Sequence, residues 1–198
     1  HIDTFAELGY ADHHAGVVLV LETDRVPPAP LIQRIAADCS VDTAALTVIL
    51  TPTGSLAGSV QIAARVVEVA LHKVHALGFP VSQVQEGLGT TPLPPPTANG
   101  LTAMGRTNDT ILFAGSVHLF VTSDDAAAHD LAAALPSTTS RDYGKPFASV
   151  FKDYNYDFFK IDSMLFSPAR VAVTALKSGR TFHAGALDEA LLERSFAH

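Results

Sequence analysis

Residues 61–75, QIAARVVEVALHKVH, place an arginine and a glutamate three positions apart in an otherwise apolar stretch. At about 100° per residue in a helix, Arg65 and Glu68 share an arc of about 80° with Gln61, His72 and His75. A carboxylate in such a pair can take a proton from an attacking water. The guanidinium can orient that carboxylate and lower its pKa, which keeps it ionised. The spacing therefore allows general-base chemistry on water.

The rest of this segment indicates where the polar strip lies. A helix is expected over residues 57–77, and most of its other positions are Val, Ile, Leu or Ala. A surface helix normally exposes a broader polar face, so the narrow strip favours a helix between layers whose polar edge lines a cleft. The alternative is a solvent-facing ion pair that contributes roughly a few tenths of a kcal/mol. The RxxE pattern alone does not decide between them.

The surrounding pattern predicts an α+β (mixed α/β) fold with two lobes and a ligand cleft between them. Residues 1–89 form the lobe with the helix, the Pro-rich segment 90–100 is the connector, and residues 101–198 form the second lobe, although the lobes can be intertwined as one unit. The other expected elements are strands buried on both faces at 16–22 and 45–52, a short helix at 81–89, two strands around Gly115, and a hairpin within 170–185 that turns at Ser178-Gly179.

Composition excludes several classes of function. The 198 residues are 47% hydrophobic and 17% charged, which indicates a buried core rather than disorder. The formal net charge is −7 without a basic cluster, which argues against nucleic-acid binding because phosphate contacts need Lys and Arg. No apolar run has the length of a membrane span. The single cysteine, Cys39, excludes an internal disulfide and a CxxC metal site, and a reducing compartment is the simplest expectation.

Four strings in the chain resemble the methenyltetrahydromethanopterin cyclohydrolase family. They are TPTGSLAGSVQIAARVVEVALHKVHALGF (51–79), AMGRTNDTILFAG (103–115), LPSTTSRDYGKPF (135–147) and DFFKIDSMLFSPA (157–169), and the likeness extends over nearly the whole chain. The resemblance implies a cytoplasmic enzyme of one-carbon metabolism that reversibly hydrolyses 5,10-methenyltetrahydromethanopterin to the 5-formyl derivative, in methanogenesis or methylotrophy. It also implies a pterin substrate between two α/β lobes, no metal, no separate cofactor, and a homo-oligomer, with a trimer favoured.

The resemblance also assigns roles to residues, because the family's catalytic arginine and glutamate match Arg65 and Glu68. Glu68 is then the base that activates water beside the cationic methenyl carbon, and Arg65 positions both. Eight further residues are candidates for substrate binding, since they lie on the helix, at a strand end, or in polar or aromatic segments: Glu22, Ser59, Gln61, His72, Arg106, Asn108, Asp109 and Lys160. Residues 106–109 are expected in a polar turn before a strand, which they could instead simply cap. Glu22 could equally be an ordinary strand-end carboxylate, and Lys160 could snorkel.

The chain departs from the family in two places, and two other functions stay open. Family members are roughly half as long again, and the missing part is N-terminal, so we expect a segment that precedes His1. His13 and His14 stand in YADHHAGV where a less basic pattern is expected. One alternative function is a truncated, non-catalytic pterin-binding paralogue. The other is a metal-dependent hydrolase built on histidines such as His72 and His75, although HxxH is not the HExxH spacing.

Overall fold

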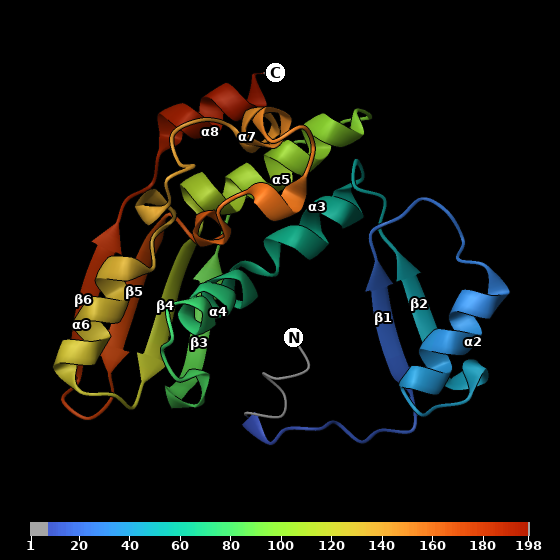
Figure 1. The fold of residues 1–198 in the computed structure, drawn as a ribbon, viewed down its shortest axis with the longest axis horizontal. Coiled ribbons are helices and arrows are strands. Elements are labelled where there is room, and N and C mark those ends of the chain that lie inside the picture. Colours follow the sequence, from blue (N-terminus) through green and yellow to red (C-terminus); the bar gives the residue numbers. More distant parts are fainter. Residues whose placement is uncertain (1–7, 198) are drawn as a thin grey trace.

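The computed structural model describes residues 8–197, which form helices and two separate sheets (Figure 1). The strands are β1 (Val17–Leu21), β2 (Leu46–Leu50), β3 (Val84–Thr90), β4 (Ser116–Val121), β5 (Arg170–Ala175) and β6 (Arg180–Gly185). The α-helices are α2 (Ala29–Asp38), α3 (Leu56–Ala63), α4 (Val66–Ala76), α5 (Gly100–Ala114), α6 (Asp125–Ala134), α7 (Phe147–Asp153) and α8 (Glu189–Phe196). Short 3₁₀ turns are η1 (Thr43–Ala45), η2 (Val81–Gln83), η3 (Ser137–Thr139), η4 (Phe158–Lys160) and η5 (Ser163–Leu165). The mixed α+β fold is confirmed.

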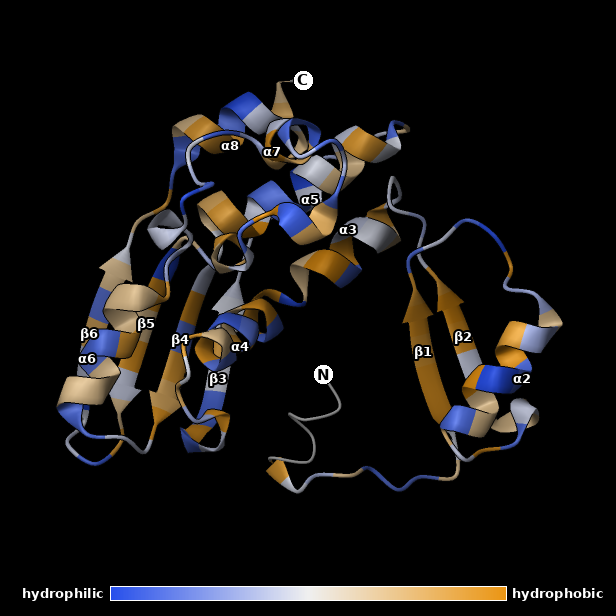
Figure 2. Cartoon of the chain, viewed as in Figure 1, coloured by the Kyte–Doolittle hydropathy of each residue, from blue (hydrophilic) through white to orange (hydrophobic). Residues whose placement is uncertain are grey.

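The two Val/Leu-rich runs form a parallel pair, β1 with β2, joined by α2 (Figure 1). Both strands are strongly apolar, as Figure 2 shows, yet their side chains alternate between half-buried and exposed. Val18 is 65% exposed, and Val20 and Ile49 are each 45% exposed. The prediction that these strands are buried on both faces is therefore wrong for the described chain, because its helices leave one face of this pair uncovered.

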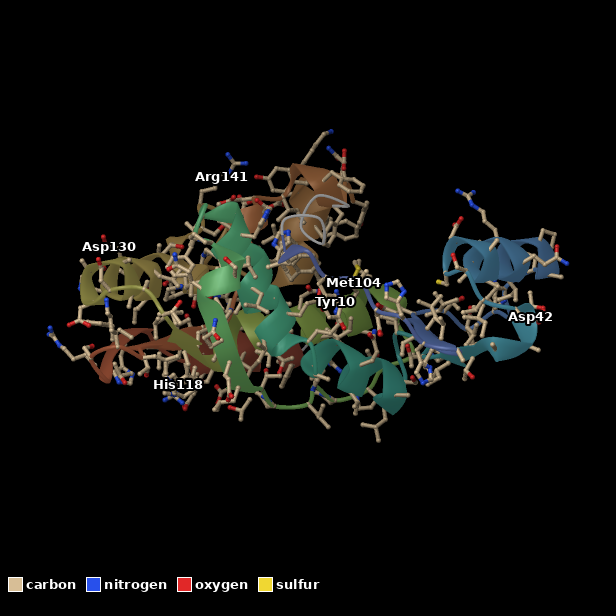
Figure 3. The ribbon with its side chains drawn as sticks, turned by 90° about the horizontal axis from the view of Figure 1, so that it is seen from below. Tyr10, Asp42, Met104, His118, Asp130 and Arg141 are labelled. Atoms are coloured by element: carbon tan, nitrogen blue, oxygen red, sulfur yellow. The ribbon has the colours of Figure 1, made fainter. Side chains whose placement is uncertain are left out.

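The larger sheet has the order β3-β4-β5-β6, with a parallel β4–β5 pair between two antiparallel pairs. Helices α4 and α6 pack on one face, where Leu119, Val121, Val171 and Val173 are buried with the helix residues. The opposite face carries His118, which lies on the side of the sheet away from Asp130 of α6 (Figure 3). The hairpin β5–β6 is confirmed.

The expected single helix over 57–77 is two helices, because Ala64 and Arg65 interrupt the helix between α3 and α4. The segment 81–89, expected as a short helix, is instead turn η2 followed by strand β3. Glycines explain this strand. A Cβ on Gly89 would lie 2.7 Å from Val66 Cγ1, and a Cβ on Gly87 would lie 3.0 Å from Val67 Cγ1. These glycines let α4 approach the sheet closely, and they do not end a helix.

Residues 100–114 form one continuous helix, so the predicted strand before Gly115 and the predicted polar turn at 106–109 are both wrong. Asn99 caps the start of α5, since its Oδ1 accepts a hydrogen bond from Thr102 N at 2.9 Å. Helices α7 and α8 pack against α5, which buries Leu112 and Phe113 in a second core. None of the helices in the described part of the chain has the length and apolar character needed to cross a lipid bilayer.

Candidate active site

A cleft of about 360 Å³ lies where α3, α4, α5 and the segment around η4 and η5 meet the end of β1. Its polar lining comes from α4, α5 and the residue after β1, and its apolar lining from α3, α4, α5 and the segment after α7. The lining residues are Glu22, Ile62, Arg65, Glu68, Val69, His72, Met104, Thr107, Asn108, Ile111, Phe158 and Phe166. Three of the five residues of the polar strip, Arg65, Glu68 and His72, therefore border this cavity.

Arg65 and Glu68 form a bidentate ion pair at this cleft. Arg65 Nη2 donates to Glu68 Oε1 at 2.8 Å, and Arg65 Nε donates to Glu68 Oε2. Arg65 occupies the cap position before α4 and Glu68 lies in the first turn of that helix, where the helix dipole favours a carboxylate. The two side chains are 52% and 58% exposed, so they face the open part of the cleft.

The hydrogen bond from Arg65 lowers the pKa of Glu68, and the charges of Arg65 and His72 add to this effect against the opposing effect of burial. The same hydrogen bond raises the pKa of Arg65 above its ordinary value, with a smaller contribution from Glu22. The sequence-based expectation that arginine lowers the pKa of this carboxyl is met. Glu68 is thus held as an anion with a fixed orientation.

Glu22 lines the cleft and contacts Gln61, which is not itself among the lining residues. Glu22 follows directly after β1, and Gln61 Nε2 of α3 donates to Glu22 Oε2 at 3.4 Å. This contact joins residues 39 positions apart and brings a second carboxylate to the same cavity as Glu68. The polar groups of this wall then include two carboxylates and one guanidinium, a balance that suits a cationic ligand.

One face of α5 forms another wall. Met104, Thr107, Asn108 and Ile111 line the cleft at spacings of three, four and seven residues, which place them on one side of a helix. Asn108 Nδ2 donates to Met104 O at 2.8 Å, which leaves its side-chain oxygen as a further acceptor. Of the predicted site residues on this segment, Asn108 therefore lies at the cleft.

The structure does not bring four other predicted site residues to the cleft. Arg106 instead donates to Pro95 O at 3.2 Å and to Phe196 O at 3.0 Å, so it ties the Pro-rich connector and the end of α8 to α5. Ser59 is 2% exposed on α3. Lys160 lies 3.3 Å from the Asp157 carboxylate, with 65% of its side chain exposed.

Asp109 is the fourth, and it is completely buried. Its carboxyl accepts hydrogen bonds from Phe147 N at 2.8 Å and from Ser195 Oγ at 2.6 Å, so it joins α5 to α7 and α8. Burial raises the pKa of Asp109 to about 7 despite these two hydrogen bonds. Because Asp109 and Asn108 are about 100° apart around the helix, one points into the core and the other to the cleft.

An aromatic wall was missed by the sequence reasoning. Phe158 and Phe166 line the cleft and stack on each other with ring centroids 4.9 Å apart and planes 26° apart. They come from the two ends of the segment 158–166, which passes through η4 and η5. The sequence contains the aromatic string DFFKIDSMLF, but only its lysine, Lys160, was predicted to bind the substrate.

The histidines within residues 8–197 do not assemble a ligand set for the metal-dependent alternative. His72 lines the cleft beside Glu68, whereas His75 is not among the lining residues. His13 and His14 are exposed, and His14 Nδ1 lies 3.1 Å from Gly16 O and N. Within residues 8–197, no three His, Cys, Asp or Glu side chains are grouped so that they could hold a metal ion.

Comparison with known proteins gives a consistent result along the whole chain. The family model described as cyclohydrolase (MCH) matches residues 1–196. A methenyltetrahydromethanopterin cyclohydrolase from Methylobacillus flagellatus is 57% identical over 196 residues, which are 99% of this chain and 60% of the relative. The protein of that name from Xanthobacter autotrophicus is 57% identical over 192 residues, which are 97% of this chain and 57% of the relative. The one from Methanosarcina mazei is 41% identical over 196 residues, 98% of this chain and 61% of the relative.

The chain spans about 60% of the length of these curated relatives. Identities of 41–57% extend over 97% or more of the chain, so both sheets and the residues that line the cleft fall inside the match. The family match and the relatives agree with the resemblance carried by the four strings. This chain is therefore a member of the cyclohydrolase (MCH) family.

Proposed function

We propose that this protein hydrolyses 5,10-methenyltetrahydromethanopterin to 5-formyltetrahydromethanopterin, in a reversible reaction of one-carbon metabolism. The observation that carries the proposal is the bidentate Arg65–Glu68 pair in the wall of a cleft that two stacked phenylalanines also line. The names of the relatives support the choice of substrate, since each is called a methenyltetrahydromethanopterin cyclohydrolase.

The charges in the cleft support this substrate class. The methenyl carbon lies between two nitrogens as a cationic amidinium, and the cleft holds the carboxylates of Glu22 and Glu68. Arg65 neutralises part of this negative charge while holding Glu68 ionised, because its hydrogen bond lowers the pKa of Glu68. A carboxylate that is already ionised can accept a proton from water at neutral pH.

Each step of the proposed reaction balances around Glu68. Water adds through its oxygen to the methenyl carbon, and Glu68 takes one water proton, which gives a neutral carbinolamine. The bond from this carbon to N10 then breaks, N10 receives the proton that Glu68 returns, and the hydroxyl proton is lost as the carbonyl of the 5-formyl group forms. Proton transfer by one positioned base contributes about 10²- to 10⁴-fold, so fixed orientation of the water by Arg65 supplies part of the remaining acceleration.

The shape of the cleft supports binding of a flat ring. Phe158 and Phe166 present stacked aromatic surface, and Met104 and Ile111 present apolar surface from α5. Aromatic rings favour offset stacking or edge contacts with other π-systems, which suits a pterin. Asn108 offers a side-chain oxygen that can accept a hydrogen bond from the amino group of such a ring.

Three further properties belong to the same proposal. The reaction uses no metal and no separate cofactor, because Glu68 and Arg65 provide the proton transfer and the orientation. The protein works in the cytoplasm, and it assembles as a homo-oligomer, for which the family resemblance favours a trimer. Size-exclusion chromatography with light scattering measures the assembly.

The test is the Glu68→Gln variant, with Glu193→Gln on the exposed face of α8 as the matched control. Loss of the near-ultraviolet absorption of the methenyl pterin reports hydrolysis, and a fluorescence or calorimetric titration reports binding. Glu68→Gln should bind the substrate but lose at least about 100-fold in kcat, because an amide cannot take the proton. Glu193→Gln should behave as the unmodified protein.

Two outcomes would contradict the proposal. Near-normal turnover by Glu68→Gln would remove Glu68 from the role of base. Binding of the pterin by the unmodified protein without accelerated hydrolysis would favour the non-catalytic pterin-binding alternative.

A further inference from the structure

Lys73 is a buried cation on the helix that carries Glu68. Its side chain has no exposed surface, and it is among the largest fully buried side chains of the described residues. The ammonium uses all three of its N–H groups, donating to Pro136 O at 2.9 Å, Thr139 Oγ1 at 2.8 Å and Met164 O at 2.8 Å. Hydrogen bonds from a charged donor are stronger than those between neutral groups, so this cluster is a strong tertiary link.

The three acceptors lie in two segments that are remote in sequence from α4. Pro136 and Thr139 flank and end η3, and Met164 lies in η5, 91 residues after Lys73. Asp162 also joins these two segments, because its carboxylate accepts hydrogen bonds from Ser140 Oγ at 2.8 Å and from Arg141 N at 3.3 Å. Lys73 therefore fixes α4 to a loop pair that is already tied together.

One of these loops carries an aromatic side of the cleft. Phe166 follows Met164 by two residues, lines the cleft, and stacks on Phe158. On α4, Lys73 is about 140° around the helix from Glu68, so it leaves the helix on a different side from the catalytic pair. The lysine thus joins the helix that bears the Arg65–Glu68 pair to the segment that carries the aromatic wall.

We propose that Lys73 is a positioning residue that sets the spacing between the Arg65–Glu68 pair and the Phe158–Phe166 wall, and so determines how tightly the pterin ring is held. The role in substrate binding rests on the proposed function, whereas the link between α4 and the loop does not. A lysine suits this place because a single ammonium presents three donors to three acceptors arranged around it.

Removing the Lys73 ammonium from water is unfavourable, so its hydrogen bonds must offset that cost. Burial lowers the pKa of Lys73 to about 8, and the nearby negative charge of Asp162 opposes that effect. A buried lysine is less favourable for stability than an apolar residue of similar length unless its hydrogen bonds are complete. Here they are complete, and they hold two loops, one of which contributes Phe166 to the lining of the cleft.

The test uses three variants of the full chain: Lys73→Met, Thr139→Val and Lys177→Met. Lys73→Met keeps most of the side-chain volume but removes all three donors. Thr139→Val removes, at an exposed position, the hydroxyl that accepts from Lys73 and that also lies within hydrogen-bond distance of Ala134 O and Pro136 O. Lys177→Met makes the same chemical change in the exposed β5–β6 turn, and serves as the matched control. Amide hydrogen exchange followed by mass spectrometry measures the loop, and steady-state kinetics with the methenyl pterin measure the site.

In Lys73→Met and, more weakly, in Thr139→Val, exchange in peptides covering 162–169 should become about tenfold faster, because local opening of that loop becomes easier. KM should rise by about tenfold in Lys73→Met while kcat stays within about twofold, because the ring is held less tightly but the Arg65–Glu68 geometry within α4 is kept. Lys177→Met should change neither quantity. A general loss of stability would instead change exchange throughout the sheet.

Unchanged exchange at 162–169 in Lys73→Met would overturn the link itself. Faster exchange with an unchanged KM would overturn the positioning role. If the unmodified protein binds the pterin without turnover, the dissociation constant replaces KM in the same comparison. If it binds no pterin, the proposed function fails and the positioning role falls with it, while the exchange data still decide whether Lys73 holds the loop.

Discussion

Replacing Asp109 with asparagine should remove a pH dependence of stability that the fold imposes. The Asp109 carboxyl is completely buried, and it accepts hydrogen bonds from Phe147 N and Ser195 Oγ. Burial raises its pKa from 3.8 to about 7. In Asp109→Asn, the side-chain oxygen can still accept from Phe147 N and the amide can donate to Ser195 Oγ, so both contacts persist without a titrating group.

The sign follows from linkage. Because the folded state holds the Asp109 proton more tightly than the unfolded state, the folded form is favoured below pH 3.8 and loses stability as the pH rises towards about 7. The full difference corresponds to about 4 kcal/mol above pH 7. Between pH 5 and pH 8 the same pKa values predict a loss of about 2.5 kcal/mol from this one group.

Urea unfolding at pH 5, 6, 7 and 8 measures this loss. The chain contains no tryptophan, so far-ultraviolet circular dichroism is the suitable signal. The free energy of unfolding of the unmodified protein, relative to Asp109→Asn at each pH, should fall by about 2.5 kcal/mol from pH 5 to pH 8. Asp38→Asn on α2, whose side chain is 72% exposed, is the control and should track the unmodified protein. Parallel pH profiles for Asp109→Asn and the unmodified protein would refute the assignment of Asp109 as a buried, titrating group.

Two more substitutions test the site and the packing beneath it. Arg65→Ala should move the acidic limb of the pH–rate profile to higher pH, because Glu68 loses the hydrogen bond that lowers its pKa. The same variant should reduce kcat/KM by at least about 100-fold. An unchanged acidic limb would mean that Arg65 does not control the ionisation of Glu68. Gly89→Ala should lower the free energy of unfolding by about 1–3 kcal/mol, because the new Cβ would lie 2.7 Å from Val66 Cγ1. Chemical unfolding measures this change, and Gly100→Ala is the control because its Cβ would meet nothing within 4 Å. Equal stability of the two variants would contradict the packing argument.

Local patterns in the sequence were sufficient for several elements. The Val/Leu-rich runs predict β1 and β2, and Ser178-Gly179 predicts the β5–β6 turn, where Gly179 has a φ of +77°. The spacing of Arg65 and Glu68 predicts that they can pair, because residues three apart on a helix are neighbours. These features depend on residues close in sequence, so the amino-acid sequence is sufficient to predict them.

Other predictions failed because the deciding neighbours are distant in sequence. Gly87 and Gly89 look like helix terminators, but they serve a strand that must admit Val66 and Val67 of α4. Residues 110–114 look like a strand, yet they belong to α5, where Leu112 and Phe113 are buried against α7 and α8. Local sequence indicates that a segment is buried. The distant partners decide whether its buried residues repeat with the period of a helix or of a strand.

The sequence by itself determined the chemical pair, the family, and the mixed fold class. Only the tertiary structure decided that Asn108 faces the cleft while its neighbour Asp109 ties helices together in the core, that Phe158 and Phe166 form a wall, and that Lys73 joins that wall to α4. The physical reason is that a side chain's type limits the interactions it can make, whereas its use depends on which distant groups the folded backbone brings within contact of it.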